Sequence, residues 1–365
     1  MSTMLFDGRD HSAFPLPHVE GDTTATGSSE FADIAAEHIM QFGLGFWASK
    51  ALLSAVELDL FTQLAAGPLD GEMLRQRLGL HPRGARDFFD ALVALGMLDR
   101  RDGVYFNMPG SDVYLDRSKP SYVGGWLHLV NTQLYPTWAS LTEALRTGKP
   151  QNGIKEGVDL FDVVYSNTES LAKYARAMTS HSLPTARALA HRFPWADYHT
   201  IIDIGAAAGG APVEISRAHP HLSGGGFDLP PLQPVFESYV QEHGFAHRLR
   251  FYAGNFLEEP LPSADVLVMG HILHDWNLGV KRELLAKAYA ALPKRGALIV
   301  YDQMIDDERR QNAAALLMSL NMLIRTRGGF DYTGADCVSW MRAAGFAEIL
   351  CEHLSGPHSM VVGIK

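Results

Sequence analysis

Polar side chains with acid–base potential follow several apolar runs in the second half of the chain. Asp203 and Asp228 end two such runs, Asn255 follows a third, and His274 and Asp302 follow two later ones. Because the carboxyl ends of the strands of an open α/β sheet meet at one edge, we expect these groups to lie around one site. Polar groups gathered at one edge of a sheet are what a binding or catalytic site requires.

His274 is the best candidate for a general base. An imidazole titrates near neutral pH and can accept a proton from a phenol, whose own pKa is about 10. A carboxylate on the other ring nitrogen would fix the tautomer and stabilise the imidazolium, and Asp302 or Asp331 could supply it. The alternative for a lone histidine is a hydrogen-bonded residue at the rim of the sheet. We expect the neighbouring Asp275 to cap the following helix.

His271, His274 and Asp275 could also form part of a metal site. No further ligand follows at a suitable spacing, so we expect no metal. The two cysteines, Cys337 and Cys351, lie in no metal-binding or redox motif and suit a reducing cytoplasm.

The stretch from Thr200 to Asp228 predicts a strand, a tight turn, a helix, a second strand and an acid, which is how a doubly wound nucleotide-binding sheet begins. The turn, residues 205–210, contains only glycine and alanine, so a cofactor can approach the backbone N–H groups at the start of the helix. A dinucleotide favours glycine where Ala207 stands. S-adenosylmethionine has no phosphate, and Asp203 could hold its ammonium group while Asp228 accepts both ribose hydroxyls. The order of acid before glycine favours S-adenosylmethionine, and a tight turn without a ligand is the alternative.

The composition is that of an ordinary globular protein, with 365 residues, 47% hydrophobic and 20% charged. No apolar run approaches the roughly 20 residues of a membrane helix, and no basic and apolar leader is present. We therefore expect a protein without a signal peptide or a membrane span. The net charge of −10 argues against nucleic acid as the main partner.

The chain divides into four regions by pattern. Residues 1–29 have no periodicity and predict a flexible or loosely docked arm. Residues 30–110 predict a winged-helix domain, because a long apolar helical stretch precedes two short helices and a hairpin on an Asp-Gly turn. Residues 111–190 predict a helical linker that contributes to a substrate pocket. Residues 191–365 alternate strands and helices and end in a hairpin, which predicts a Rossmann-like α/β domain.

The winged-helix pattern has two interpretations. DNA binding would require a basic domain, but acidic residues clearly outnumber basic ones in residues 1–110. The apolar helical stretch is too hydrophobic for an exposed helix pair and should pack against another chain or domain. We therefore favour a dimerisation module.

With these residues in hand, the chain resembles the plant-type small-molecule O-methyltransferases, such as the caffeic acid and acetylserotonin enzymes, and their bacterial antibiotic-pathway relatives. The resemblance begins near Glu30 and is most specific in segments 203–205, 227–230, 254–256 and 273–276 and in the loop at Gly328 and Gly329. It implies a C-terminal S-adenosylmethionine-binding methyltransferase domain and an N-terminal winged-helix module that dimerises and closes the pocket of its partner.

The resemblance also assigns roles residue by residue. The base would be His274, flanked by Asp302 and Asp331. The cofactor, which leaves as S-adenosylhomocysteine, would be lined by Asp203, Gly205, Asp228, Leu229, Asn255 and Phe256. The acceptor pocket would include Tyr174, Met178, Met322 and Thr326.

The chain departs from the family pattern in several places. Ala206 and Ala207 replace loop glycines, Asn255 replaces an aspartate, and Gly270 stands where plant enzymes often carry a lysine. The two acids that flank the base are each one methylene shorter than the usual glutamates, so their contact with it is direct, bridged by water or absent.

We expect a homodimeric, cytoplasmic, S-adenosylmethionine-dependent O-methyltransferase that acts on a hydroxyl of a small aromatic metabolite. The nearest alternative is C- or N-methylation on the same fold. A different class is a non-catalytic winged-helix protein that senses a small molecule, and a nicotinamide oxidoreductase is disfavoured by Ala207.

Overall fold

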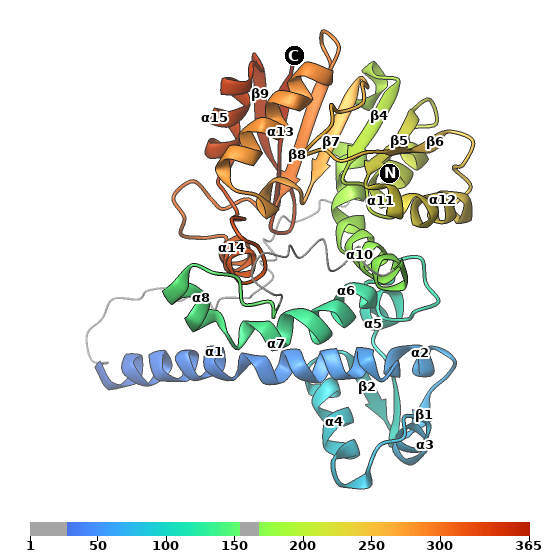
Figure 1. Ribbon diagram of the computed structural model, residues 1–365. Helices are drawn as coiled ribbons and strands as arrows, with labels where there is room; N and C mark the ends of the chain where they lie inside the picture. Colours follow the sequence, from blue (N-terminus) through green and yellow to red (C-terminus); the bar gives the residue numbers. More distant parts are fainter. Residues whose placement is uncertain (1–27, 154–167) are drawn as a thin grey trace, which may run out of the picture. The chain divides into compact units, whose positions relative to one another are not determined.

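The computed structural model describes residues 28–153 and 168–365, with side chains from residue 36 in the first range and from residue 170 in the second. The described chain divides into two compact units, one ending at Pro136 and the other beginning at Thr137 (Figure 1). The arm expected over residues 1–29 lies almost wholly outside the described residues.

The first unit begins with one long helix, α1, Ser28–Glu57, which continues through Gly43 and Gly45 without a break. The short helices and the hairpin that the sequence predicts follow it, and a two-residue strand that it does not predict joins the hairpin in the order β1-β3-β2. These elements are α2 (Leu60–Ala65), β1 (Leu69–Asp70), α3 (Gly71–Arg77), α4 (Pro82–Ala94), β2 (Leu98–Arg101) and β3 (Val104–Asn107). The helices α5 (Pro109–Tyr114) and α6 (Gly124–Leu129) and the π-helix η1 (Val130–Leu134) follow.

Helix α1 leaves an apolar face uncovered in this unit. Ile39, Phe42 and Trp47 are 69%, 60% and 61% exposed. Residues Ala36–Glu57 are also long and apolar enough to cross a membrane by length and composition alone, a property that the sequence analysis did not expect. The exposed face agrees with the expectation that this stretch packs against something outside its own unit.

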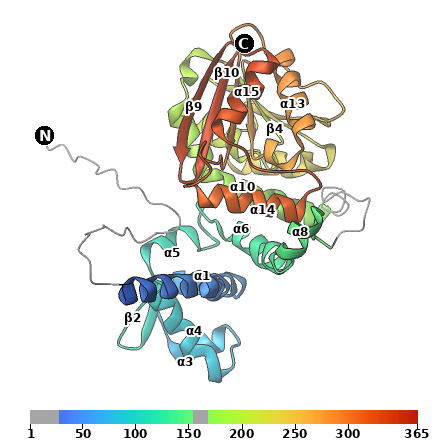
Figure 2. The same cartoon turned by 90° about the vertical axis from the view of Figure 1, so that its left-hand side faces the viewer.

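The second unit contains a seven-stranded sheet in the order β6-β5-β4-β7-β8-β10-β9. Its strands are β4 (Thr200–Ile204), β5 (Ser223–Asp228), β6 (Leu249–Ala253), β7 (Val266–Gly270), β8 (Ala297–Asp302), β9 (Glu348–Ser355) and β10 (His358–Ile364). The first five are parallel, whereas β10 runs antiparallel to both β8 and β9. Figure 2 shows this final hairpin with α15 beside it. The mainly parallel sheet closed by a hairpin is confirmed.

Helices and short 3-10 turns connect the strands. Helix α7, Tyr135–Trp138, spans the division between the units. The other helices are α8 (Leu141–Thr147), α10 (Thr168–Arg192), α11 (Gly210–Ala218), α12 (Gln233–Glu242), α13 (Leu278–Ala291), α14 (Ala313–Arg325) and α15 (Gly334–Ala344). The 3-10 turns are η2 (Trp195–Asp197), η3 (Pro230–Leu232) and η4 (Leu273–Asp275). Helix α15 begins with the predicted capping box between Thr333 and Asp336.

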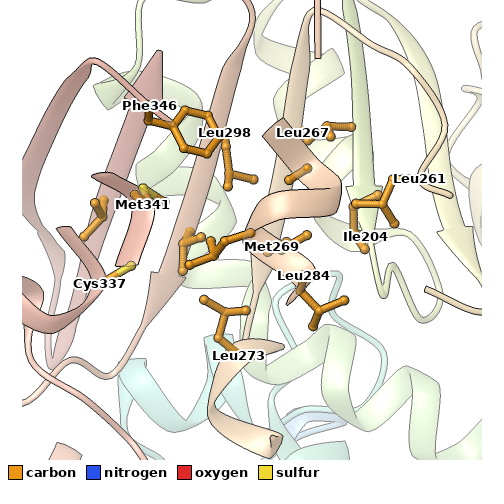
Figure 3. Close-up of a cluster of buried hydrophobic side chains, with 14 of the residues drawn as sticks. Ile204, Leu261, Leu267, Met269, Leu273, Leu284, Leu298, Cys337, Met341 and Phe346 are labelled. Atoms are coloured by element: carbon orange, nitrogen blue, oxygen red, sulfur yellow. The ribbon is translucent and has the colours of Figure 1, made fainter. Parts of the chain in front are cut away.

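The central strands are apolar on both faces because successive side chains point to opposite sides. Leu267 and Met269 of β7 belong to a cluster with residues of α13 and α15, which Figure 3 shows. Val266 and Val268 of the same strand belong to a second cluster with Leu189 of α10. Helices therefore cover the sheet on both faces.

The strands β4, β5, β7 and β8 end at the same edge of the sheet because they are parallel. Strand β10 begins there, since Ser359 pairs with Asp302 at the end of β8. We call this the carboxyl edge of the sheet. Its loops carry most of the residues that the sequence assigns to chemistry.

Candidate active site

The turn η4 places His274 directly after β7 at the carboxyl edge. Leu273 is fully buried in the hydrophobic core and anchors the turn. His271 has a φ of +56°, in the left-handed region that non-glycine residues seldom adopt. A Cβ on Gly270 would lie 2.0 Å from the Tyr301 ring, so a larger residue would require that ring to move.

His274 is only 7% exposed and is surrounded by carboxylates. Its Nδ1 lies 3.2 Å from Asp331 Oδ1, which is hydrogen-bonding distance, and 3.7 Å from Asp302 Oδ1. Its Nε2 lies 3.8 Å from Asp275 Oδ1. The structure thus brings the three predicted residues together, with a direct contact for Asp331. Asp302 is adjacent but accepts its own hydrogen bond from the Tyr332 hydroxyl.

The expectation that Asp275 caps the next helix is wrong. Asn277 is the N-cap of α13, and its side chain accepts a hydrogen bond from the Val280 N–H. The backbone of Asn277 is in the β region, and the helix begins directly after it at Leu278. Asp275 is left free to face His274, so it belongs to the charged cluster.

The electrostatics of the cluster favour a protonated imidazole. Burial alone disfavours the imidazolium, but Asp302, Asp331 and Asp275 outweigh it and raise the pKa of His274 to about 10. Burial in turn raises the pKa of Asp302 to about 7, although the neighbouring His274 lowers it. The site therefore holds a proton readily and stabilises the charged form of His274.

Lys281 is a second cation of the cluster, and it was not predicted. It is fully buried on α13, and its Nζ donates hydrogen bonds to the carbonyls of Trp276 and Phe330 at 2.6 and 2.9 Å. Burial lowers its pKa to about 8, and the cluster carboxylates work against that shift. The ammonium group ties the segment of His274 to the loop that carries Asp331. No motif marks it, because a lysine in a helix usually lies on the solvated face.

Two acids lie in the last residues of β4 and β5 at the same edge. The Asp228 carboxylate accepts hydrogen bonds from the Ala207 and Leu229 N–H groups at 2.9 and 2.8 Å, which fixes its direction. Asp203 is buried, and burial together with Asp228 raises the pKa of Asp203 to about 8. A cationic group beside Asp203 would lower that pKa, as the ammonium of S-adenosylmethionine would.

The turn between these acids offers bare backbone. Gly205 has a φ of +76°, and a Cβ on it would lie 2.2 Å from the Ile272 side chain. Ala207 also has a positive φ, +49°, so alanine adopts the conformation for which family members use glycine. Phe256 packs edge-on against Trp276 nearby. The acids, the turn and this apolar wall fit the amino acid, ribose and adenine parts of S-adenosylmethionine.

The side chains of two predicted residues, Asn255 and Thr326, form hydrogen bonds with the backbone of nearby turns. The Asn255 side chain accepts a hydrogen bond from the Leu257 N–H, which shapes its own turn. The Thr326 hydroxyl donates to the Met322 carbonyl and accepts from the Gly329 N–H. Thr326 therefore connects the end of α14 to the loop at Gly328 and Gly329.

The remaining acceptor-pocket candidates lie on α10 and α14. Met178 is half-buried and Met322 is buried. Burial raises the pKa of Tyr174 to about 12, with Arg325 acting against the shift and Asp275 adding to it. Tyr174 thus lies near both the carboxylates around His274 and Asp228 at the end of β5. Arg325, buried at the end of α14, is a second charged residue that was not predicted.

Comparison with known proteins agrees with this geometry. Residues 138–347 match the O-methyltransferase domain, and residues 40–117 match the O-methyltransferase dimerisation domain. The chain belongs to the O-methyltransferase family. An O-methyltransferase of this family uses S-adenosylmethionine, so the chain is an S-adenosylmethionine-dependent methyltransferase with a dimerisation domain, and the predicted fold class and cofactor are confirmed.

Individual relatives match between about three quarters and nine tenths of this chain. The tetracenomycin polyketide synthesis 8-O-methyl transferase TcmO of Streptomyces glaucescens is 45% identical over 90% of this chain and 96% of its own. The N,N-dimethyltransferase OxyT of Streptomyces rimosus is 40% identical over 74% and 79%. The crystal structure of human N-acetylserotonin methyltransferase in complex with S-adenosylmethionine superposes with a TM-score of 0.84 at 26% identity, over 93% and 99%.

The buried ammonium of Lys281 should be essential for stability. Lys281→Met keeps the length of the side chain but leaves two buried carbonyls without donors and removes a cation from three carboxylates. We expect a loss of about 3 kcal/mol or more in the free energy of unfolding, measured by urea denaturation. Lys294→Met, at an exposed position, is the control and should change stability by less than about 0.5 kcal/mol. Equal effects of the two substitutions would contradict the structural role of Lys281.

Proposed function

We propose that this enzyme methylates a phenolic hydroxyl of a fused-ring aromatic metabolite of the polyketide type, with His274 as general base. The observation that carries the proposal is the buried His274 imidazole, whose Nδ1 is hydrogen-bonded to Asp331 at 3.2 Å. The identity of 45% with an enzyme named for 8-O-methylation in tetracenomycin polyketide synthesis supports the acceptor class.

In the proposed reaction, bound S-adenosylmethionine supplies a methyl group on a sulfonium. His274 keeps its Nδ1–H toward Asp331 and presents Nε2 to the acceptor hydroxyl. Nε2 would take the phenolic proton as the phenolic oxygen accepts the methyl group, and the sulfonium would leave as the neutral thioether of S-adenosylhomocysteine. The new imidazolium would be stabilised by Asp331, Asp302 and Asp275. A base whose conjugate acid has a pKa near that of a phenol makes this proton transfer nearly balanced in free energy.

The cofactor and acceptor positions are assigned on the same basis. Asp228 would bind the ribose hydroxyls, Asp203 the ammonium, and the Gly205 turn with Leu229, Asn255 and Phe256 would line the rest. Tyr174, Met178, Met322 and Thr326 would form walls of the acceptor pocket. These assignments rest on the placement of the residues around the carboxyl edge and on the family pattern.

N-methylation is the second candidate, because OxyT, named as an N,N-dimethyltransferase, is 40% identical to this chain. An amine acceptor would also have to lose a proton before or after attack, and His274 could take it. The two chemistries separate on the product. NMR of the methylated product from an acceptor that carries both a phenol and an amine, such as an amino-naphthol, shows whether the new methyl carbon is bound to oxygen or to nitrogen.

Replacement of His274 should separate chemistry from cofactor binding. His274→Ala removes the proton acceptor but none of the residues placed around the cofactor. We expect turnover of a naphthol or hydroxyanthraquinone acceptor to fall by about 100- to 10,000-fold, with radiolabelled S-adenosylmethionine as the methyl source. Calorimetric affinity for S-adenosylhomocysteine should stay within about twofold. His191→Ala, at an exposed position, is the control, and unchanged turnover in His274→Ala would rule out the base assignment.

The pH dependence should report the carboxylates around the base. Neutral His274 is the active form, so kcat/KM should rise with pH toward the raised pKa of about 10. Asp331→Asn removes a group that stabilises the imidazolium, so the pKa of His274 falls and the rising limb moves about 1 to 3 pH units lower. Asp331→Glu should restore the original limb. All variants are assayed with the same acceptor, so the titration of its hydroxyl contributes equally to every profile. Identical pH profiles for the wild type and Asp331→Asn would contradict the proposal.

We also propose that the dimerisation domain forms a homodimer through α1, and that residues 30–110 act as a winged-helix module. The occupant of the exposed α1 face would be a second copy of this chain. Beside that face, Phe46, Trp47, Phe88 and Tyr135 line a groove with a volume of about 770 Å³. The match to an O-methyltransferase dimerisation domain supports a protein partner for this face rather than a membrane.

The dimer proposal is tested by light scattering after size exclusion. Phe42→Asp combined with Trp47→Asp places two charges on the exposed face and should convert a dimer into a monomer. Met73→Asp is the matched control, because Met73 is also exposed but lies on α3, away from that face. A monomeric wild type, or a double variant that stays dimeric, would contradict the assignment.

A cytoplasmic location is proposed on the cysteines and on the proposed dimer. Cys337 and Cys351 are both free thiols, the first buried and the second exposed. An exposed free thiol suits a reducing compartment. The apolar helix would be covered by the second copy in a dimer, so its composition does not require a membrane.

A further inference from the structure

Three histidines from distant parts of the sequence gather beside the carboxyl edge. His181 lies on α10, His271 follows β7, and His358 is the first residue of β10. The ring centroids are 5.0 Å apart for His181 and His271, 5.0 Å for His271 and His358, and 6.0 Å for His181 and His358. One nitrogen from each ring lies within 4.8 Å of the other two.

Two of these rings have a buried nitrogen without a hydrogen-bond partner among residues 28–153 and 168–365. The Nε2 atoms of His271 and His358 are both in this state. Buried polar atoms are nearly always hydrogen-bonded, so two such atoms in one cluster call for a ligand. Nothing in the proposed methyl transfer uses them.

The other nitrogens of the same two rings face groups that can hold them. His271 Nδ1 lies 3.6 Å from Asp302 Oδ1, and the Ser355 backbone hydrogen-bonds to the His358 ring. A carboxylate or a backbone carbonyl on one nitrogen fixes the tautomer and leaves the lone pair of the other available. The His358 ring has such a hydrogen bond, and Asp302, at 3.6 Å from His271 Nδ1, lies just beyond the distance for one.

The backbone around His271 adds an independent observation. The residue is held at a φ of +56°, and its N–H donates to the Tyr301 carbonyl. A left-handed conformation at a non-glycine residue carries strain that the surrounding structure must maintain. The surrounding contacts therefore hold the His271 backbone in this conformation, with its ring close to those of His181 and His358.

We propose that His181, His271 and His358 form a binding site for a divalent transition-metal ion of the zinc type. Three neutral imidazoles with an open fourth position are a donor set that zinc accepts. Zinc–nitrogen distances of about 2.0–2.1 Å would place the ligand nitrogens about 3.3 Å apart, so binding needs only small side-chain rotations. Asp302 would be the carboxylate behind His271. No sequence motif predicts this site, because its three ligands lie far apart in the chain.

The test measures metal binding and needs no turnover. Full-length protein without a histidine tag is stripped with EDTA, dialysed and titrated calorimetrically with Zn²⁺ alone. We expect one ion per chain. His181→Asn and His358→Asn should each weaken Zn²⁺ binding by at least about tenfold. Loss of a residue that only hydrogen-bonds to a metal ligand already costs about that much, and loss of a ligand should cost no less. His191→Asn, exposed on the same helix α10, is the matched control and should bind as the wild type does.

A second measurement on the wild type keeps the test decisive if a variant fails to fold. The Co²⁺-loaded protein should show the visible absorption of a tetrahedral site, and its X-ray absorption should show imidazole ligands. Absence of saturable Zn²⁺ binding to the wild type would overturn the proposal. Undiminished binding in both folded variants, or a Co²⁺ spectrum of an octahedral ion without imidazole, would do the same.

Discussion

Three carboxylates around one imidazole, two of them buried and that of Asp275 half-buried, are the constraint on which the rest of the site depends. Asp275, Asp302 and Asp331 could not all stay ionised at a site with so little exposure to solvent unless cations lay nearby. Buried charge without compensation is strongly unfavourable. His274 and Lys281 supply those cations. The same interactions that keep the cluster stable also raise the proton affinity of His274. The stability of the cluster and the base catalysis proposed for His274 therefore depend on the same contacts.

The fold makes this cluster possible by bringing separate segments to one edge. Strands β7 and β8 deliver the His274 turn and Asp302, and the loop after α14 delivers Asp331. The bridge between Ile305 and Thr333 holds that loop against the continuation of β8. Beneath the edge, side chains such as Leu267 and Val268 pack on opposite faces of the sheet, so the strand ends have little freedom to move.

Sequence patterns predict those features of the fold and the site that depend on residues close together in the chain. The glycine and alanine turn, the strand ends and the capping box of α15 depend on neighbouring residues, so their prediction succeeded. Lys281 and Arg325 were missed because burial of a charged residue depends on distant segments, which carry no signal in the helix itself. Asp275 was misplaced because Asn277, two residues on, competes for the same cap and wins it.

The short side chains of Asp302 and Asp331 make different contacts with His274. Asp331 contacts His274 directly, whereas one oxygen of Asp302 accepts from Tyr332. Its other oxygen lies 3.6 Å from His271 Nδ1 and 3.7 Å from His274 Nδ1. A longer glutamate would have more freedom to turn toward one ring. The aspartate instead stands between the proposed base and the histidine cluster, so a change in charge on either side acts on the same oxygen. The two proposed sites are therefore electrostatically coupled through Asp302.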